Sequence, residues 1–386
     1  PWVISGEPLS LAGPQFPPSV KGWLSSVNLL HVRAVGRSDT LHYVWSSIGA
    51  PTVLLIYTRS ERSALRVNWA KLLSASPAGA IWIEPPGSVV YATAVVFTKV
   101  FEYNGANASA LSKGQEEPFY PPYDLAGFSW QSANHTVNRT ALTAQFQGVD
   151  TSDPGGAFRN GTISFQVRGP SPPGRPGRPP LPRLLHTANS SKVEFIMDKV
   201  APRGNSSRFM LEVVTVEEKG GGHKRLQSVR SIDDEYTPTI FEMAQLVSGP
   251  RNDSIGPNFF QWKTTAYGSR DASRENAIRC RYSPLQTANR TLPGPSIAHA
   301  YFGEGLGRSH SVAAINISFG ADGPDRPLRC WSALLGFGTP PEDAFSPLVM
   351  AIVAVGLGTP VVLLLAGGLV VLFARRKHQS QYEPIN

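Results

Sequence analysis

The sequence predicts a mainly β protein that consists of two β-sandwich-like domains followed by a single C-terminal transmembrane α-helix. Many short runs are rich in Val, Ile, Thr, Tyr and Trp, and several alternate apolar and polar residues with the period of a β-strand. Helical periodicity is confined to two candidates, residues 68–75 and 240–247. One uncharged apolar stretch near the C-terminus is long enough to cross a lipid bilayer.

The boundary between the two predicted domains is the segment 169–183, GPSPPGRPGRPPLPR. Pro and Gly dominate this segment, so it cannot form the interior of a regular strand or helix. It is either an interdomain linker or a long surface loop within one domain, and its position near the middle of the extramembrane part favours a linker. We therefore expect a first domain over residues 1–168 and a second over residues 184–345.

Residues 346–374 are predicted to form the transmembrane helix. Its central 27 residues, 348–374, carry no charge, and about 20 apolar residues in a helix cross a bilayer. Arg375, Arg376 and Lys377 follow directly, so the positive-inside rule places residues 375–386 in the cytosol and residues 1–345 on the exoplasmic side. This topology requires a secretory signal, and we expect the sequence to be a mature form without its signal peptide.

Acceptor sequons for N-glycosylation are abundant on the exoplasmic side. Composition alone would give about two N-x-S/T sequons with a residue other than Pro in the middle, whereas the sequence has nine. Each glycan needs solvent at its asparagine, so the nine positions are predicted to lie on the surface. They are Asn107, Asn134, Asn138, Asn160, Asn189, Asn205, Asn252, Asn289 and Asn316.

The sequence contains only two cysteines, Cys280 and Cys330. In an oxidising compartment such a pair is expected to form one disulfide, which would stabilise the fold by about 4 kcal/mol in the chain-entropy model. The alternative is two buried free thiols. A metal site is not indicated, because no His stands at ligand spacing from either cysteine.

Composition and motifs argue against several function classes. The net charge is +8, but the basic residues are scattered and none forms a stripe on a helix, so nucleic acid is not an expected partner. The metalloprotease HExxH and hydrolase GxSxG patterns are absent. Residues 219–224, KGGGHK, are interpreted as a hairpin turn, and the acidic run 233–235 as a solvated turn. We therefore predict a non-enzymatic protein without a cofactor or a bound metal.

The cytosolic tail ends in Tyr382-Glu383-Pro384-Ile385, which fits the sorting pattern of a tyrosine followed three residues later by a bulky apolar residue. Clathrin adaptor subunits bind such a segment as an added edge strand, with Tyr382 and Ile385 in separate pockets. Seven residues separate Tyr382 from Ala374 and span up to about 25 Å when extended, so a membrane-bound adaptor is within reach. The common version of this signal has Gly before the tyrosine, where this chain has Gln381.

The combination of many sequons, the Pro-rich segment 169–183, one C-terminal membrane helix and a tail ending YEPIN resembles the glycosylated lysosomal membrane protein family. The resemblance extends over the whole chain. It implies a single-pass type I lysosomal membrane protein with a lumenal N-terminal part. It also implies a non-catalytic accessory subunit that stabilises a lysosomal transporter of the major facilitator superfamily and protects it from lumenal proteases.

The membrane helix is compatible with such a partner. Ala351, Ala354 and Gly358 lie at i, i+3 and i+7, and small residues on one helix face allow a second helix to approach closely. The rest of the helix is expected to contact membrane lipid. The alternative to an accessory subunit is a lysosomal hydrolase or a ligand-binding receptor that is tethered by its helix.

Overall fold

The structure is a computed structural model. It describes residues 3–8, 27–104, 120–153, 155–170, 181–218, 224–233, 235, 239–248, 256–287, 292, 295–303, 305–319, 328–342 and 347–379. Two compact units are present. The first comprises Pro1–Arg230 and Phe241–Glu342, and the second comprises Ser231–Ile240 and Asp343–Asn386.

Strands account for nearly all regular structure before the C-terminal helix. They are β1 (Val3–Pro8), β2 (Leu29–Val35), β3 (Thr40–Ser46), β4 (Thr52–Thr58), β5 (Ala64–Val67), β6 (Ile81–Glu84), β7 (Val89–Asn104), β8 (Tyr123–Asp124), β9 (Ser129–Trp130), β10 (Thr143–Val149), β11 (Thr162–Arg168), β12 (Ser190–Asp198), β13 (Ser207–Glu218), β14 (Lys224–Asp233), β15 (Thr239–Ser248), β16 (Asn258–Lys263), β17 (Thr265–Tyr267), β18 (Ala277–Tyr282), β19 (His310–Phe319) and β20 (Leu328–Phe337).

The helices are few and mostly short. They are α1 (Trp69–Leu72), α2 (Ile297–Phe302), α3 (Leu306–Ser309) and α4 (Pro347–Gln379), together with the 3-10 turns η3 (Pro86–Ser88), η5 (Leu125–Gly127), η6 (Ala133–His135) and η7 (Arg274–Asn276). The mainly β class with one long C-terminal helix is therefore confirmed.

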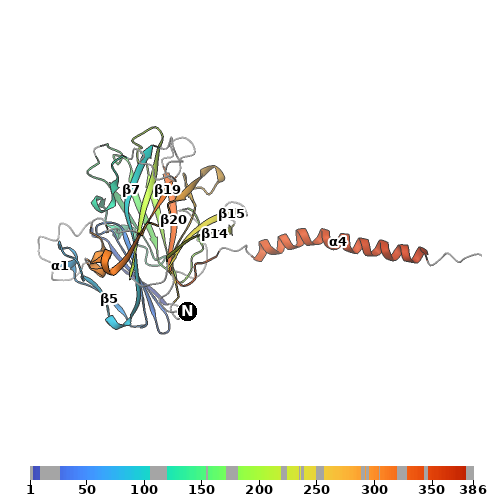
Figure 1. The fold of residues 1–386 in the computed structure, drawn as a ribbon, viewed down its shortest axis with the longest axis horizontal. Helices are drawn as coiled ribbons and strands as arrows, with labels where there is room; N and C mark the ends of the chain where they lie inside the picture. The colour runs from blue at the N-terminus through green and yellow to red at the C-terminus, as the bar shows by residue number, and fades with distance from the viewer. Residues whose placement is uncertain are drawn as a thin grey trace, which may run out of the picture. The chain divides into compact units, whose positions relative to one another are not determined.

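The strands of the first unit form two antiparallel layers (Figure 1). One layer has the order β1-β2-β3-β4-β7-β13-β19-β18, and β8 also pairs with β7. The other has the order β9-β10-β11-β12-β20-β16-β15, with β17 also beside β20. The layers are joined where β17 pairs with β18. A separate two-stranded sheet, β5–β6, completes the unit.

The predicted division into two domains is wrong. Strand β7 precedes the segment 169–183 and pairs with β13, which follows it, from Thr93–Glu217 to Asn104–Ser207. Strands β11 and β12, on either side of the segment, are also direct antiparallel neighbours. The segment therefore connects two paired strands of one sandwich, as a loop within one domain does, and residues 171–180 of it lie outside the described part.

The two helical candidates have different outcomes. Residues 68–75 contain the single turn α1, which begins after Asn68 because the Asn68 side chain accepts a hydrogen bond from the Lys71 amide. Residues 240–247 belong to β15 instead, so this helical expectation is wrong. Pairing with β16 places Ala244 and Leu246 in the core between the layers, and this tertiary pairing overrides a weak local helical pattern.

Aromatic side chains from both layers interleave in the core. Phe97 of β7 contacts Phe165 of β11, with ring centroids 4.8 Å apart. Phe165 contacts Phe195 at 5.4 Å, and Phe195 stacks on Phe319 of β19 at 5.6 Å. Phe319 then meets Trp331 of β20 at 6.3 Å. Each such pair contributes about 0.5–1.5 kcal/mol beyond the burial of apolar area, so this row fixes the layers against each other.

A buried histidine pair lies on the opposite face of the first layer. The rings of His31 and His42 stack with centroids 5.2 Å apart, and His31 Nε2 and His42 Nδ1 share a 3.0 Å hydrogen bond. His42 Nε2 is 2.8 Å from Ser63 Oγ. Burial, and then the nearby Arg33, lower the pKa of His31 to about 3. Burial, and then His31 and Arg33, lower the pKa of His42 to about 2. Both rings therefore stay neutral in the folded protein even at mildly acidic pH.

We predict that this pair makes the free energy of unfolding depend on pH. Both folded-state pKa values lie below the unfolded value of 6.5, so the unfolded chain binds more protons, and the contribution to stability is lost as pH falls below about 6.5. Between pH 7 and pH 5 the loss is about 2 kcal/mol for each histidine. A His31→Gln, His42→Gln protein should lose less stability over this range than the unmodified chain, as measured by denaturant unfolding.

The matched control for this measurement is His135→Gln, because His135 is exposed. This variant should show the same pH dependence as the unmodified protein. An equal loss of stability in the double variant and in the control would contradict the assignment to the buried pair.

Candidate functional site

Helix α4 is the membrane-anchoring element of the chain. Residues Pro347–Lys377 are long and apolar enough to cross a membrane, and no other helix in the described part of the chain meets this criterion. The helix continues through the three basic residues to Gln379, beyond the predicted end at residue 374. Thr359 Oγ1 donates a 2.6 Å hydrogen bond to the Val355 carbonyl, which satisfies the most polar side chain of the span. Ala351, Ala354 and Gly358 all lie within the helix, and their role in packing remains a prediction.

Four sequon asparagines lie on exposed turns of the β body. Asn134 is part of η6, and Asn138 is in the turn that follows, where its side chain accepts a 2.9 Å hydrogen bond from the Ala141 amide. Asn160 lies between β10 and β11, and Asn205 between β12 and β13. All four are exposed, as an acceptor for a bulky glycan requires. Asn107, Asn252 and Asn289 lie outside the described residues.

Two further sequon asparagines are half-buried parts of the fold. The Asn189 carbonyl accepts hydrogen bonds from Tyr43 Oη at 2.7 Å and from the Phe337 amide at 3.1 Å. Asn316 lies within β19, and its amide donates a 3.0 Å hydrogen bond to Ser283 Oγ. The surface prediction is therefore met fully at four of the six described sequons and only partly at these two.

The predicted disulfide is not formed, and both cysteines are buried free thiols. Successive side chains of a strand point to opposite faces, and Trp331 of β20 points into the core between the layers together with Cys280. Cys330 therefore points to the other face of its layer, where burial and then Glu194 raise its pKa to about 12. A disulfide needs facing Cβ atoms about 4 Å apart, so two thiols on opposite faces of a layer cannot form one.

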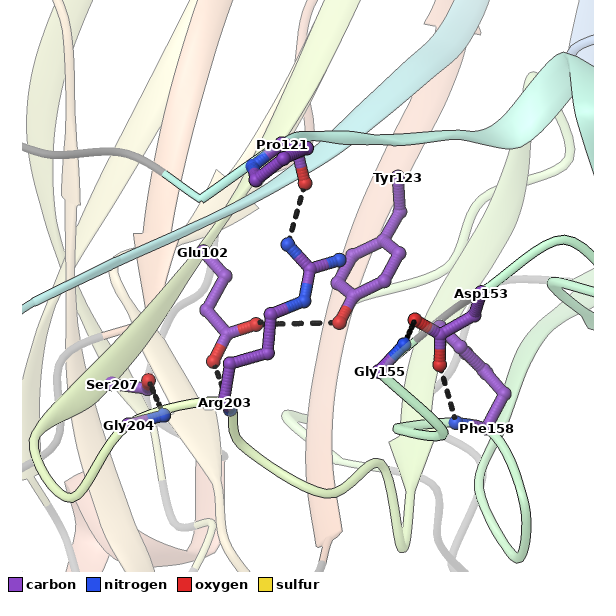
Figure 2. A network of polar contacts seen from close by, with 9 residues as sticks. All are labelled: Glu102, Pro121, Tyr123, Asp153, Gly155, Phe158, Arg203, Gly204 and Ser207. Carbon is purple, nitrogen blue, oxygen red and sulfur yellow. Dashed lines mark hydrogen bonds and ion pairs between the residues drawn. The ribbon is translucent and has the colours of Figure 1, made fainter.

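Figure 2 shows a polar network that is centred on Glu102 near the end of β7. The Glu102 carboxylate is fully buried, and Oε1 accepts a 2.5 Å hydrogen bond from the Arg203 backbone amide. Its Oε2 lies 3.5 Å from Arg203 Nε and accepts a 3.3 Å hydrogen bond from Tyr123 Oη. Arg203 Nη1 also donates to the Pro121 carbonyl at 2.7 Å. The carboxylate thereby ties β7 to the β12–β13 connection and to β8.

The Arg203 guanidinium stacks on the Tyr123 ring, with its Cζ 4.0 Å from the ring centroid. The rings of Tyr123 and Phe158 pack edge to face with centroids 5.1 Å apart. Asp153 Oδ2 accepts a 3.3 Å hydrogen bond from the Phe158 amide (Figure 2). Burial, and then the Glu102 charge, raise the pKa of Tyr123, so its hydroxyl stays protonated as a donor. We call the contacts among Glu102, Tyr123 and Arg203 the Glu102 clasp. Together with Phe158, it holds the β7–β8, β10–β11 and β12–β13 connections, and the last two of these carry Asn160 and Asn205. The sequence prediction missed it, although a lone Glu in the apolar run of β7 was a signal.

Other buried charges are also paired. Lys192 Nζ lies 2.5 Å from Glu194 Oε1, and Lys224 Nζ lies 3.3 Å from Glu217 Oε1. Burial raises the pKa of Glu194 against the opposing effect of Lys192, and burial lowers the pKa of Lys224 against the opposing effect of Glu217. Breaking a buried pair leaves an uncompensated buried charge, so loss of one partner would cost more stability than the intact pair contributes.

Serine hydroxyls lie within hydrogen-bonding distance of a histidine ring at several places in the described residues. Ser309 Oγ is 2.8 Å from His310 Nδ1 at an exposed position, and Ser296 Oγ is 3.2 Å from His299 Nδ1 at a partly buried one. Ser63 and His42 are within hydrogen-bonding distance, but both are fully buried. An open hollow of about 370 Å³ is lined by charged and polar side chains, with the buried Cys280 at its wall. Burial raises the pKa of the Cys280 thiol, which therefore stays protonated and unreactive. The other lining residues are Glu242, Thr264, Arg279, Arg281 and Tyr282.

Metal ligands do not converge in the described part of the chain, where no group of three His, Cys, Asp or Glu side chains could hold an ion. The acidic run 233–235 was expected to be a solvated turn, and this expectation is wrong. Asp233 and Glu235 are only 2% and 5% exposed, and Asp233 Oδ1 accepts a 3.0 Å hydrogen bond from the Glu235 amide. The sorting residues Tyr382 and Ile385, and residues 219–223 of the predicted turn, lie outside the described residues.

Comparison with known proteins identifies the family. A family model described as "Glycosylated lysosomal membrane protein" matches residues 28–378. Glycosylated lysosomal membrane protein A of Xenopus laevis is 53% identical over 367 residues, which are 94% of this chain and 90% of the relative. The Bos taurus protein is 45% identical over 94% of this chain and 88% of its own length. The Homo sapiens protein is 42% identical over 95% of this chain and 89% of its own length.

None of these relatives carries an enzyme name. The matched residues include strands β2–β20 and nearly all of α4, so the match covers most of the β body and the membrane anchor together. The chain therefore belongs to the glycosylated lysosomal membrane protein family, whose members are lysosomal membrane glycoproteins.

Proposed function

We propose that this chain is a non-catalytic accessory subunit that stabilises a lysosomal transporter of the major facilitator superfamily and shields it from lumenal proteolysis. The observation that best supports this role is the combination of one membrane-spanning helix with a single β body, in a family whose relatives carry no enzyme name. Such a molecule could offer its partner a binding surface, an anchor in the membrane and steric protection from proteases.

Resistance of the subunit itself to proteases follows from its packing. A protease must unfold a segment locally before cleavage, and segments with many buried contacts open least often. Strand β13 is paired on both sides, with β7 and β19, and almost all of its residues are buried. Glycans at the exposed turns would add steric cover to the less protected connections.

Part of the β body is free of sequons and therefore open to a protein partner. Residues 1–106 contain none, and this range includes strands β2–β7 and the β5–β6 hairpin. On that hairpin Trp82 is exposed next to the ion pair between Arg66 Nε and Glu84 Oε2, at 2.6 Å. Trp and Arg are the residue types that contribute most at protein interfaces, so this surface supports a contact with lumenal loops.

Within the bilayer we assign the partner contact to the small-residue face of α4. Removal of this chain from cells should lower the abundance of its transporter without lowering the transcript, and a triple variant Ala351→Leu, Ala354→Leu, Gly358→Leu should fail to restore it. The larger side chains would prevent close approach of a partner helix. Purification in mild detergent with mass spectrometry identifies the partner and measures how much of it is retained.

The matched control is Gly356→Leu. At 100° per residue, position 356 lies on the face of the helix opposite to Ala351, Ala354 and Gly358. This variant should restore the transporter. Unchanged abundance of every membrane protein after removal of the chain, together with an activity in the isolated lumenal part, would instead support the tethered hydrolase or receptor.

The tail is proposed to direct the protein to lysosomes through a clathrin adaptor that binds Tyr382 and Ile385. Tyr382→Ala should raise the fraction at the cell surface, because the tyrosine pocket of the adaptor would stay empty. Surface biotinylation measures this fraction, and Gln381→Ala is the matched control. Unaltered lysosomal confinement of the Tyr382 variant would exclude the tail as the sole address.

Glycans are proposed at Asn134, Asn138, Asn160 and Asn205. Each Asn→Gln substitution should remove one glycan from the mass of the protein, and the fourfold variant should have a shorter lysosomal half-life because its exposed turns become accessible to proteases. Gel mobility and pulse-chase measurements test both expectations. Arg139→Lys keeps the Asn138 sequon and serves as the control. A half-life equal to that of the unmodified protein would contradict steric protection.

A further inference from the structure

The two layers of the β body separate at β18, and the open hollow lies at this point. Strand β17 pairs with β18 as far as Thr265 opposite Arg279, whereas Cys280–Tyr282 of β18 pair with β19. The Thr264 carbonyl accepts a 2.9 Å hydrogen bond from the Cys280 amide, and the Thr264 amide donates a 3.0 Å hydrogen bond to the Glu242 carbonyl. The volume of the hollow, about 370 Å³, lies within the range of about 300–1,000 Å³ that small-molecule sites have.

Two guanidinium groups line this hollow from one strand. Arg279 and Arg281 are separated by one residue on β18, so their side chains leave the same face of the strand about 7 Å apart. Both are exposed, so a ligand can reach them from solution. A guanidinium group binds a carboxylate, phosphate or sulfate through parallel hydrogen bonds. This wall of the hollow is therefore suited to an anionic group.

The other polar residues of the hollow supply hydrogen-bond acceptors and hydroxyl groups. Glu242 Oε1 accepts a 2.9 Å hydrogen bond from Ser228 Oγ, and a carboxylate has about four acceptor positions, so Glu242 can also accept from a ligand. Thr264 Oγ1 donates a 3.2 Å hydrogen bond to the Glu242 carbonyl and can accept one in return from a ligand. These groups are complementary to the hydroxyl groups of a ligand.

An aromatic ring with a fixed position completes the lining. The half-buried ring of Tyr282 meets the fully buried Trp262 edge to face, with centroids 5.7 Å apart. Burial, and then the Glu242 charge, raise the pKa of Tyr282, so its hydroxyl group stays protonated. A partly exposed aromatic ring provides an apolar surface with a polar tip, which suits a ligand whose C–H and O–H groups alternate.

We propose that this hollow binds an acidic sugar. The anionic group would lie between Arg279 and Arg281, and the ring hydroxyls would donate to Glu242 and Thr264. The negative charge of Glu242 disfavours a second anionic group, so the ligand carries one. The site is independent of the proposed role in transporter stabilisation. Its ligand is either the terminal sugar of an N-glycan or a free monosaccharide.

The proposal is tested with glucuronate, which has one carboxylate on a hydroxylated ring. The full chain is kept in a detergent without a sugar head group, and binding at mildly acidic pH is measured by ligand-observed saturation-transfer NMR. Glucuronate should bind, whereas glucose, which lacks the carboxylate, should bind much more weakly. Arg279→Gln and Arg281→Gln should each weaken glucuronate binding about tenfold, because hydrogen bonds to a charged group are lost.

The matched control is Arg274→Gln, which removes an exposed arginine that does not line the hollow. This variant should bind glucuronate like the unmodified chain. Equal binding by the unmodified chain and both variants at positions 279 and 281 would overturn the proposal, and so would equal binding of glucose and glucuronate.

Glu242→Gln distinguishes a sugar from an amino acid as the ligand. The glutamine carbonyl still accepts a hydrogen bond from a hydroxyl group, so this variant should retain glucuronate binding. Stronger binding of free glutamate than of glucuronate to the unmodified chain, with loss of that preference in Glu242→Gln, overturns the assignment to sugars. Sialidase treatment separates the two sources. Glucuronate binding that increases after treatment identifies glycan-borne sialic acid, unchanged binding identifies a free acidic sugar, and either result supports the site.

Discussion

The antiparallel pairing of β7 with β13 is the constraint on which the rest of the β body depends. It joins a strand that ends at Asn104 to one that begins at Ser207, and β13 then pairs with β19 on its other side. Three strands from widely separated parts of the chain thus form the centre of one layer. The bulge between Glu212 and Val213 shifts the register within this pairing, which continues on both sides of it from Thr93–Glu217 to Asn104–Ser207. Neither half of the sequence can close its core without the other.

Buried ionisable groups of the β body are accommodated in two different ways. Carboxylates such as Glu102 and Glu217 keep their partners close, through Arg203 and Lys224. The pair of His31 and His42 instead stays neutral and satisfies its ring nitrogens within the fold. The first arrangement holds charges in place, and the second avoids creating charge. Acid acts against the second arrangement, because the free energy of unfolding falls as pH drops below about 6.5 while the two rings stay neutral in the fold.

Sequence reasoning succeeds here where local patterns decide structure. The period-two runs correspond to strands, and the uncharged stretch after residue 347 is helical because nothing else satisfies its backbone in lipid. Sequence-based prediction fails where contacts between residues far apart in the chain determine the structure. The Pro-rich segment looks like a linker because the pairing of β11 with β12 across it has no local signature. The cysteines look like a disulfide because the sequence does not show which face of a layer each one occupies. The clasp of Glu102 and Arg203 joins residues 101 positions apart.

The extension of α4 beyond its basic residues limits how the cytosolic end can be recognised. Residues 375–379 continue the helix and project about 8 Å, where an extended chain would cover roughly twice that distance. Tyr382 is the third residue after Gln379, so it lies at most about 18 Å from Ala374. An adaptor that binds the proposed sorting residues would therefore do so close to the cytosolic leaflet. The helical residues 375–379 shorten the reach of the tail, which would favour adaptors that are already bound to the membrane over adaptors that are free in the cytosol.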